Sequence, residues 1–445
     1  MSLKRNNVVQ TDTKAYELND KPPLIQLIPL SLQHVLLFLA STIAVPMIIG
    51  SALGVSSAEQ TLLIQCGIFV AGIGTILQAF GIGPIGNRLP ILLGATFTFV
   101  TPCIAISQAY GFSAFVGACI ICGILVTLFG RICINFIQKL FPPLIMGCVI
   151  MVIGLALVGT AVDYCAGGSG AEQYGSVQNY AVALLTLAVV IALNTWGRGF
   201  LKGASILVAI VVGFIISLPL GMVDFASVSE ASWFALPEPL HWGISFSLPA
   251  TLIVAMLSIV NIVEFLGDTS NTAFIVTGKS ATNEDLSRGI VCDGIASTIS
   301  AIFNTIPAIS YSGNIGLIGL TGVKSRFIVG TAGIILVGLG FIPKLAAFFS
   351  LVPSAVIGGA TLAVFGTITT SGLSLIMNSK PTDRDKLIIG ISLAIGLGFN
   401  YTPAALVDYP FYVSALVNGI PGAGFSAIVL NAILPKNPKK DDEEA

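Results

Sequence analysis

The chain has 445 residues, of which 55% are hydrophobic and only 9% are charged. A soluble globular domain carries roughly 25% charged residues. This composition therefore excludes a soluble globule, and the long apolar runs require a bilayer around most of the chain. The formal net charge of −1 gives no indication of a nucleic-acid partner. The polar stretches are too short for a separate soluble domain.

The positive charges indicate the topology. All but Lys344 of the 20 Lys and Arg residues fall in the terminal tails or on alternate connections between apolar segments. The positive-inside rule then places both termini in the cytoplasm, which requires an even number of crossings, and we expect fourteen. The start of the chain is polar through Pro22–Pro23 and does not resemble a cleaved signal peptide.

These spans divide the chain into five parts. We expect a cytoplasmic N-terminal tail at 1–24 and a first repeat of seven segments at 25–220. An extracytoplasmic loop at 221–245 separates it from a second repeat at 246–433, and a cytoplasmic tail follows at 434–445. The expected fold class is an all-α polytopic membrane protein.

Two segments do not read as simple helices. The third begins after Pro90 with a β-rich half, and Thr101–Pro102 then predicts a helix start. The tenth also opens extended, before Ser312, Gly313 and Asn314 offer a helix start. We therefore expect a short β-strand followed by a half-helix in each.

The spacing of these broken segments indicates a repeat. Segments three and ten are seven apart, and because seven is odd, the second copy of a seven-segment unit enters the membrane inverted. Paired broken segments in matching positions of two halves are typical of the midplane site of a secondary transporter.

Acidic residues lie inside the eighth apolar segment. Asn261, Glu264 and Asp268 share one helical face there. A charge at the bilayer centre costs at least about 2.5–3.5 kcal/mol on insertion scales, so such residues are retained for function. Two carboxylates in a low-dielectric site can take up and release a proton near neutral pH. The alternative is that the pair only bonds helix ends, but no Lys or Arg lies within a span to pair with it.

Two further polar residues have two interpretations each. Asp293, early in the ninth segment, is either part of the proton path or a structural acceptor that supports the broken tenth segment. His34, which follows Gln33 in the first segment, either bonds substrate or a carboxylate, or is a satisfied core histidine.

The half-helix starts would point free backbone N–H groups at the middle of the protein, where they favour an anion or a carbonyl-rich solute. Several neighbouring side chains could add hydroxyl, amide and ring contacts: Thr96, Phe97, Thr98, Phe99, Tyr311, Ser312 and Asn314.

Two other classes of protein fit less well. An anion exchanger or channel on the same architecture would be expected to use a cation at the site, whereas Glu264 repels anions. A membrane-embedded enzyme needs a nucleophile with a base or clustered metal ligands, and the sequence offers neither catalytic nor metal residues in such spacing. Cys119 and Cys122 form a single C-x-x-C and read as buried small hydrophobes.

The tenth segment carries a recognisable motif. The run from Asn314-Ile315-Gly316 to Thr321-Gly322 resembles the N-x-G-x-x-x-x-T-[RKG] signature of the nucleobase–ascorbate transporter family. Other stretches that resemble the family are Leu32-Gln33-His34, Gly94 to Phe99, Glu264 with Gly267-Asp268, Asp293-Gly294 and Phe303-Asn304-Thr305. The resemblance covers nearly the whole chain and is greatest to bacterial xanthine and uric-acid permeases.

The resemblance implies fourteen segments in two inverted repeats, arranged as a core and a gate domain, in a homodimer in the bacterial inner membrane. It implies elevator-type exchange of access and symport of a purine base, with a proton rather than sodium as coupling ion and no cofactor. Glu264 would bond ring N–H groups, Asp268 and Asp293 would support the site or the proton path, and Phe97 would contact the base. Thr96, Thr98 and Thr321 would tune specificity, and His34 would hold the hydrogen-bond network.

One residue departs from the family pattern. The residue before Asn314 is usually Gln, Glu or Pro, and here it is Gly313. Either a larger purine fills the space, or substrate is held differently, or it is not a standard nucleobase. Guanine and uracil stay open as alternatives, although the small uracil ring would lose half its side-chain clamp.

Overall fold

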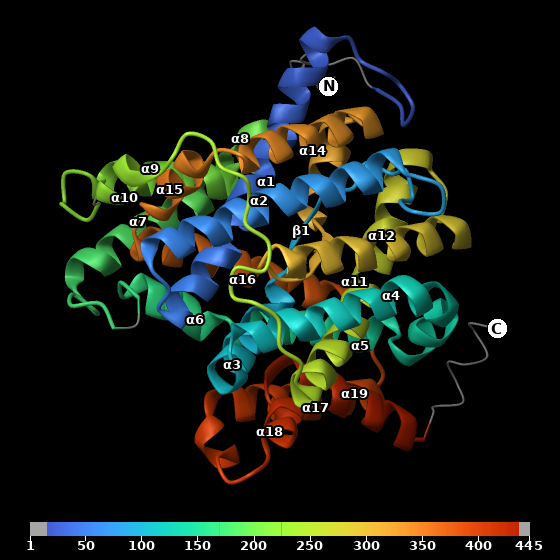
Figure 1. Cartoon of the computed structure of the whole chain (residues 1–445). Helices are drawn as coiled ribbons and strands as arrows, with labels where there is room; N and C mark the ends of the chain where they lie inside the picture. Colours follow the sequence, from blue (N-terminus) through green and yellow to red (C-terminus); the bar gives the residue numbers. More distant parts are fainter. Residues whose placement is uncertain (1–15, 169, 224, 436–445) are drawn as a thin grey trace, which may run out of the picture.

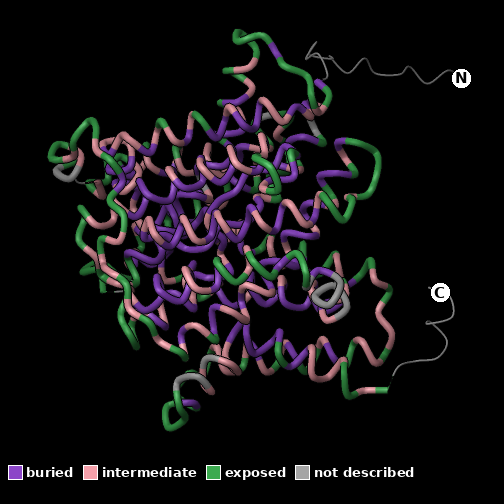
Figure 2. The backbone as a smooth tube through the Cα atoms, turned by 45° about the vertical axis from the view of Figure 1, so that its right-hand side comes forward, coloured by how far each residue is buried: buried purple, intermediate pink, exposed green. Residues whose placement is uncertain are grey.

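The computed structural model describes residues 16–168, 170–223 and 225–435. The expected terminal tails therefore lie largely outside the described residues. Most of the described chain is helical, and buried residues concentrate in the middle of the molecule while loops and helix ends are exposed (Figure 2). Figure 1 shows β1 near the centre and the C-terminal helices α17, α18 and α19 at one end of the molecule.

The helices pack in two groups. The first helix group contains the broken third and tenth segments. Its members are α1 (Leu24–Leu53), α2 (Ser57–Phe80), α3 (Val100–Tyr110), α4 (Phe112–Leu140), α11 (Leu248–Thr277), α12 (Asn283–Ile302), α13 (Ser312–Thr321), α14 (Arg326–Gly340) and α15 (Pro343–Ser350).

The second helix group is built around the long helix α16. Its members are α5 (Pro143–Ala156), α6 (Val158–Cys165), α7 (Val177–Trp196), α9 (Ser205–Ser217), α16 (Ser354–Asn378), α17 (Asp383–Tyr401), α18 (Phe411–Val417) and α19 (Gly419–Ile433). Short connecting elements complete the chain: α8 (Phe200–Gly203), α10 (Ala226–Glu230), and the 3-10 turns η1 (Phe97–Phe99) and η2 (Pro403–Leu406).

Among the described residues, seven helices are long and apolar enough to cross a membrane: α1, α2, α4, α7, α11, α16 and the run Pro143–Cys165 formed by α5 and α6. An eighth span results if α14 and α15, bent by 86° at their junction, count as one, and α9 and α19 are shorter apolar helices. The fold is therefore a mostly helical, polytopic membrane fold.

Close contacts between glycines join helices within each group. A Cβ on Gly72 of α2 would lie 2.6 Å from the backbone oxygen of Gly333 in α14. In the second helix group, a Cβ on Gly147 of α5 would lie 2.7 Å from the oxygen of Gly372 in α16. Small residues let backbones approach this closely, which is how membrane helices gain packing energy without a hydrophobic driving force.

The expected strands are present in both broken segments. β1 (Leu93–Ala95) pairs antiparallel with β2 (Ala308–Ser310), with Gly94 opposite Ile309. Backbone groups left over by this short ladder find side chains, as buried backbone at membrane depth must. The Leu93 N–H donates to Oγ1 of Thr75, and the carbonyl of Ala308 accepts from Oγ of Ser297 at 3.3 Å.

The helix start expected at Thr101–Pro102 lies two residues too late, because α3 begins at Val100. The Thr96 side chain accepts from the Thr98 N–H at 3.2 Å and begins turn η1, which runs directly into α3 at Val100. Pro102 is tolerated because it lies in the first turn of α3, where its missing N–H has no helical partner. In the tenth segment α13 begins at Ser312, as expected.

Candidate functional site

A large cavity lies between the two helix groups and encloses about 1790 Å³, including its open side. One wall comes from α1, the broken segments and α11, and the other from α5, α9 and α16. The lining residues of the first wall include Phe38, Ser41, Gly94, Thr96, Phe97, Thr98, Glu264, Asp268, Asn271, Ser310, Tyr311, Ser312 and Gly313. Those of the second wall are mostly apolar, among them Met146, Ile150, Ile206, Ile210, Ile357, Ala360 and Val364.

The acidic residues of α11 give the first wall its chemistry. Asp268, 8% exposed, accepts from Oγ of Ser310 at 2.7 Å and from Oγ of Ser312 at 2.8 and 3.0 Å. Glu264 lines the same cavity one helical turn away, and its buried Oε2 has no hydrogen-bond partner among the described residues. An unpaired buried acceptor costs roughly 1–3 kcal/mol, so this oxygen is poised to accept from a ligand or to hold a proton.

Both half-helix starts contribute to this wall, from opposite ends of the β ladder. β1 and β2 pair antiparallel, so η1 follows the end where Ala95 lies opposite Ala308, and α13 follows the end where Ser310 lies opposite Leu93. The first N–H groups of a helix have no partner within the helix itself. Thr96, Phe97 and Thr98 all line the cavity here. The Phe97 ring also meets Phe365 of α16 edge-on, with centroids 5.3 Å apart, so it bridges the two helix groups.

His34 and Asn314 brace this arrangement from behind. Nδ1 of His34 lies 2.6 Å from Oδ1 of Asn314, and Nδ2 of Asn314 donates to the Pro90 carbonyl at 2.7 Å. The amide oxygen can only accept, so Nδ1 of His34 carries the proton. Neither side chain is among the cavity-lining residues. The pair therefore ties α1, the start of α13 and the approach to β1 together.

Replacing Asn314 by Ala is expected to lower the thermal stability of the purified protein by about 1–3 kcal/mol, because it leaves two buried groups without a partner. Thermal unfolding in detergent measures this. Asn271→Ala, at an exposed position that lines the large cavity, is the matched control and should unfold at the wild-type temperature. Equal melting of the Asn314 variant and wild type would contradict the bracing role.

Asp293 lies deeper than the cavity surface. It is 2% exposed, and its Oδ2 accepts from Nδ2 of Asn261 at 3.2 Å, while that same amide reaches the Ala308 carbonyl at 3.4 Å. Asp293 thus orients Asn261, which in turn supports β2. Its other oxygen, Oδ1, has no partner among the described residues. This geometry fits a structural acceptor that supports the broken tenth segment. The oxygen without a partner could also hold a proton, so a role in the proton path stays a proposal.

Thr321 lies apart from the other candidates. It occupies the last position of α13, and its hydroxyl donates to the Leu317 carbonyl. It is not among the cavity-lining residues, whereas Thr98 is. A specificity role for Thr321 would have to act through the packing of α13.

Sequence reasoning missed several lining residues. Phe38 and Ser41 follow His34 at i+4 and i+7, and Asn271 follows Glu264 at i+7, so helical periodicity could have found them. The contribution of α16 was missed because its cavity face reads as ordinary apolar packing.

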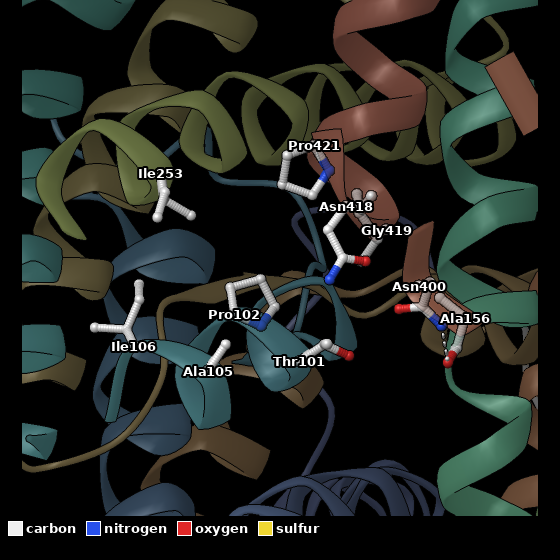
Figure 3. A pocket seen from close by; sticks show the side chains of 11 residues that line it. Thr101, Pro102, Ala105, Ile106, Ala156, Ile253, Asn400, Asn418, Gly419 and Pro421 are labelled. Carbon is white, nitrogen blue, oxygen red and sulfur yellow. Dashed lines mark hydrogen bonds between the residues drawn. The ribbon is translucent and has the colours of Figure 1, made fainter. Parts of the chain in front are cut away.

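A smaller cavity of about 430 Å³, including its open side, lies beside α3. Figure 3 shows Thr101, Pro102 and Ala105 of α3 facing Asn400, Asn418 and Pro421 of the second helix group. Ile253, near the start of α11, also lines it, about 27 Å along the helix from Asn271 in the large cavity. The two cavities therefore lie at different depths along the same boundary between the helix groups.

Comparison with known proteins decides the family. Residues 25–405 match the profile Xan_ur_permease, described as "Permease family". This chain belongs to the nucleobase–ascorbate transporter family. Membership makes it a multi-pass membrane transporter of nucleobases and not an enzyme.

Three relatives illustrate the match. The chain is 36% identical over 431 residues to the xanthine permease of Bacillus subtilis, covering 94% of this chain and 96% of the relative. It is 37% identical to the uric acid permease PucJ of the same organism, covering 93% of each. The uric acid transporter UacT of Escherichia coli is 35% identical, over 91% of this chain and 85% of the relative.

Solved structures support the fold alone. The transmembrane domain of the cyanobacterial bicarbonate transporter BicA aligns with a TM-score of 0.55 at 17% identity, covering 90% of this chain and 97% of that one. The murine anion transporter Slc26a9 in its inward-facing state aligns with a TM-score of 0.65 at 12% identity, covering 93% of this transporter and 69% of that chain.

Proposed function

We propose that this transporter imports an oxidised purine, xanthine or uric acid, by proton symport. The observation that carries the proposal is Glu264, whose buried and unpaired carboxylate oxygen lies at the cavity wall beside the half-helix starts. Relatives named as xanthine and uric acid permeases support the substrate class.

The wall is complementary to an oxidised purine. Such a base carries ring N–H groups, which a carboxylate accepts, and carbonyl oxygens, which the free N–H groups at the starts of η1 and α13 can bind. Phe97 offers a ring face for stacking, and Thr98 lies at the edge of the same surface. Asp268 fixes Ser310 and Ser312, and thereby the start of α13, against α11.

The proton is the coupling ion in this proposal. In the described part of the chain no ion pair involves Glu264, Asp268 or Asp293. A buried carboxylate without a cation is neutralised most simply by a proton. Uptake of a proton by one of these three carboxylates together with the substrate, and release of both on the cytoplasmic side, would tie purine movement to the proton gradient.

Alternating access would follow from the two walls. In this proposal the first helix group is the core and the second is the gate, and fourteen segments form two inverted repeats. The polar wall would slide along the apolar wall of α16, as in an elevator. The large cavity extends to Asn271 and Leu375, near the helix ends that precede Lys279 and Lys380. With basic connections in the cytoplasm, this is an inward-open arrangement.

The same topology would place both termini on the cytoplasmic side of the plasma membrane. The described helices of the two repeats run from Leu24 to Ser217 and from Leu248 to Ile433.

A homodimer, with gate helices at the interface, belongs to the same proposal. Measurement of mass in detergent, corrected for bound detergent, tests it.

Anion exchange is the second candidate, and the fold shared with BicA and Slc26a9 favours it. The cavity argues against it, because Glu264 and Asp268 are the charged residues that line its wall and both are acidic. A fixed negative charge at the site repels a small inorganic anion such as chloride, which has no N–H groups to donate to the carboxylates.

Uptake of radiolabelled xanthine or urate into cells that overproduce the protein is expected to rise as the external pH falls and to collapse when a protonophore is added. Replacing sodium by potassium is the control and should change nothing. Uptake that persists without a proton gradient, or that requires sodium, contradicts proton coupling. Uptake of bicarbonate or chloride without purine transport would favour the anion exchanger.

A further inference from the structure

Two glycines in the broken segments leave room for two aromatic rings. A Cβ on Gly94 of β1 would lie 2.2 Å from Cζ of Phe38. A Cβ on Gly313 of α13 would lie 2.5 Å from Cζ of Tyr311 and 2.6 Å from its hydroxyl oxygen. Real side chains do not sustain such distances. The two rings can therefore hold these positions only because residues 94 and 313 have no side chain.

The direction of Tyr311 follows from its neighbours. Ser310 and Ser312 both donate to Asp268 of α11. Side chains alternate along extended backbone, so Tyr311, between them, points away from α11. Its ring instead meets Phe38 of α1, with centroids 5.2 Å apart and an angle of 65° between the ring planes. Ser41, on the next turn of α1, lies beside the phenol hydroxyl.

The phenol therefore occupies the volume that a side chain at position 313 would need. Tyr311, Gly313, Phe38 and Ser41 all line the same cavity as Glu264. Gly313 itself is exposed to that cavity, with no side chain of its own to offer. The tyrosine hydroxyl can both donate and accept a hydrogen bond, which a ring or a methyl group at this place could not do.

We propose that the Tyr311 hydroxyl is the substrate-selecting group at the start of α13 and contacts a carbonyl oxygen of the purine in place of a side chain at position 313. The inference rests on the proposed purine transport and assigns one more contact within that site. Gly313 is then a positioning residue, since its missing side chain admits the phenol. Phe38 contacts the ring from the other side, and the missing side chain of Gly94 leaves room for Phe38.

The test substitutes Tyr311 and Gly313, singly and together, and measures xanthine and urate binding to the purified full-length protein by titration calorimetry. Tyr311→Phe keeps the ring and removes the hydroxyl, and we expect about tenfold weaker binding, the usual cost of one lost hydrogen bond. Gly313→Gln should also bind about tenfold more weakly, because its Cβ collides with the ring. The double variant Tyr311→Ala/Gly313→Gln removes the obstacle and supplies an amide, so it should bind more tightly than Gly313→Gln alone.

Three controls distinguish loss of a substrate contact from misfolding of the variants. Tyr409→Phe alters an exposed tyrosine that does not line the cavity and should bind as wild type. Thermal unfolding without ligand shows whether each variant folds, and Gly313→Ala, which adds only the colliding Cβ, replaces the Gln variant if that one does not. Wild-type affinity in Tyr311→Phe, or a folded double variant no tighter than Gly313→Gln, overturns the assignment. Failure of the wild-type protein to bind any purine would instead reject the proposed function.

Discussion

Replacing Glu264 by Gln is expected to abolish purine uptake. The amide places an N–H donor where the substrate's ring N–H groups need an acceptor, and it cannot exchange a proton. A hydrogen bond to a charged group contributes about 1.5–3 kcal/mol, so its loss alone weakens binding roughly 10- to 150-fold. Loss of proton exchange should lower the initial uptake rate further. Uptake of labelled xanthine or urate into cells, with binding measured on the purified protein, separates the two effects.

Because Glu264→Gln should stay folded, a loss of uptake in this variant can be assigned to the missing carboxylate. Glu264 has a buried oxygen without a partner among the described residues, so removing its charge relieves a desolvation cost. We expect Glu264→Gln to unfold at the wild-type temperature or above. Glu172→Gln, in the exposed loop between α6 and α7, is the matched control and should transport normally. Normal uptake by the Glu264 variant would reject its assignment as the substrate acceptor.

Asp268→Asn is expected to impair transport by a different route, with a loss of stability. Asp268 accepts from Ser310 and Ser312 together, and an amide presents one acceptor and one donor group in place of two acceptor oxygens. Breaking these bonds should cost about 1–3 kcal/mol and release the start of α13, with roughly 10- to 100-fold weaker purine binding. Thermal unfolding and purine titration of the same sample measure both.

The contrast between the two variants is itself informative. Asp408→Asn, exposed between η2 and α18, controls for loss of an acidic group and should match wild type in both measurements. If Asp268→Asn binds purine normally and melts at the wild-type temperature, then Asp268 does not position α13. If it loses binding but keeps full stability, Asp268 contacts the substrate directly.

The sequence predicted the polar wall better than the apolar one. Asn261, Glu264 and Asp268 were found because charges inside an apolar run are costly and because helical periodicity puts them on one face. The strands of segments three and ten were found from their β-rich residues and helix-start signals. In contrast, nothing distinguishes Ile357 or Val364 of α16 from residues that face lipid, so the second wall could not be assigned.

The start of the half-helix in the third segment was misplaced for a physical reason. Thr101–Pro102 is a good capping pattern, yet the Thr96 hydroxyl satisfies an N–H group earlier in the chain. The 3-10 turn that links Thr96 to α3 depends on the pairing of β1 with β2, which is a tertiary contact. Local signals cannot choose between two candidate caps when a distant strand fixes one of them. The same holds for Tyr311, whose direction depends on Asp268.

The three-residue ladder between β1 and β2 limits where this protein can be redesigned for another substrate. A slip of one residue in their pairing would turn every side chain of the shifted strand to the opposite face and displace the half-helix start that follows it. Substitutions on the cavity face of α16 would not disturb this pairing, because the apolar side chains of Ile357, Ala360 and Val364 only shape the cavity there. Reshaping should begin on that helix and leave the ladder untouched.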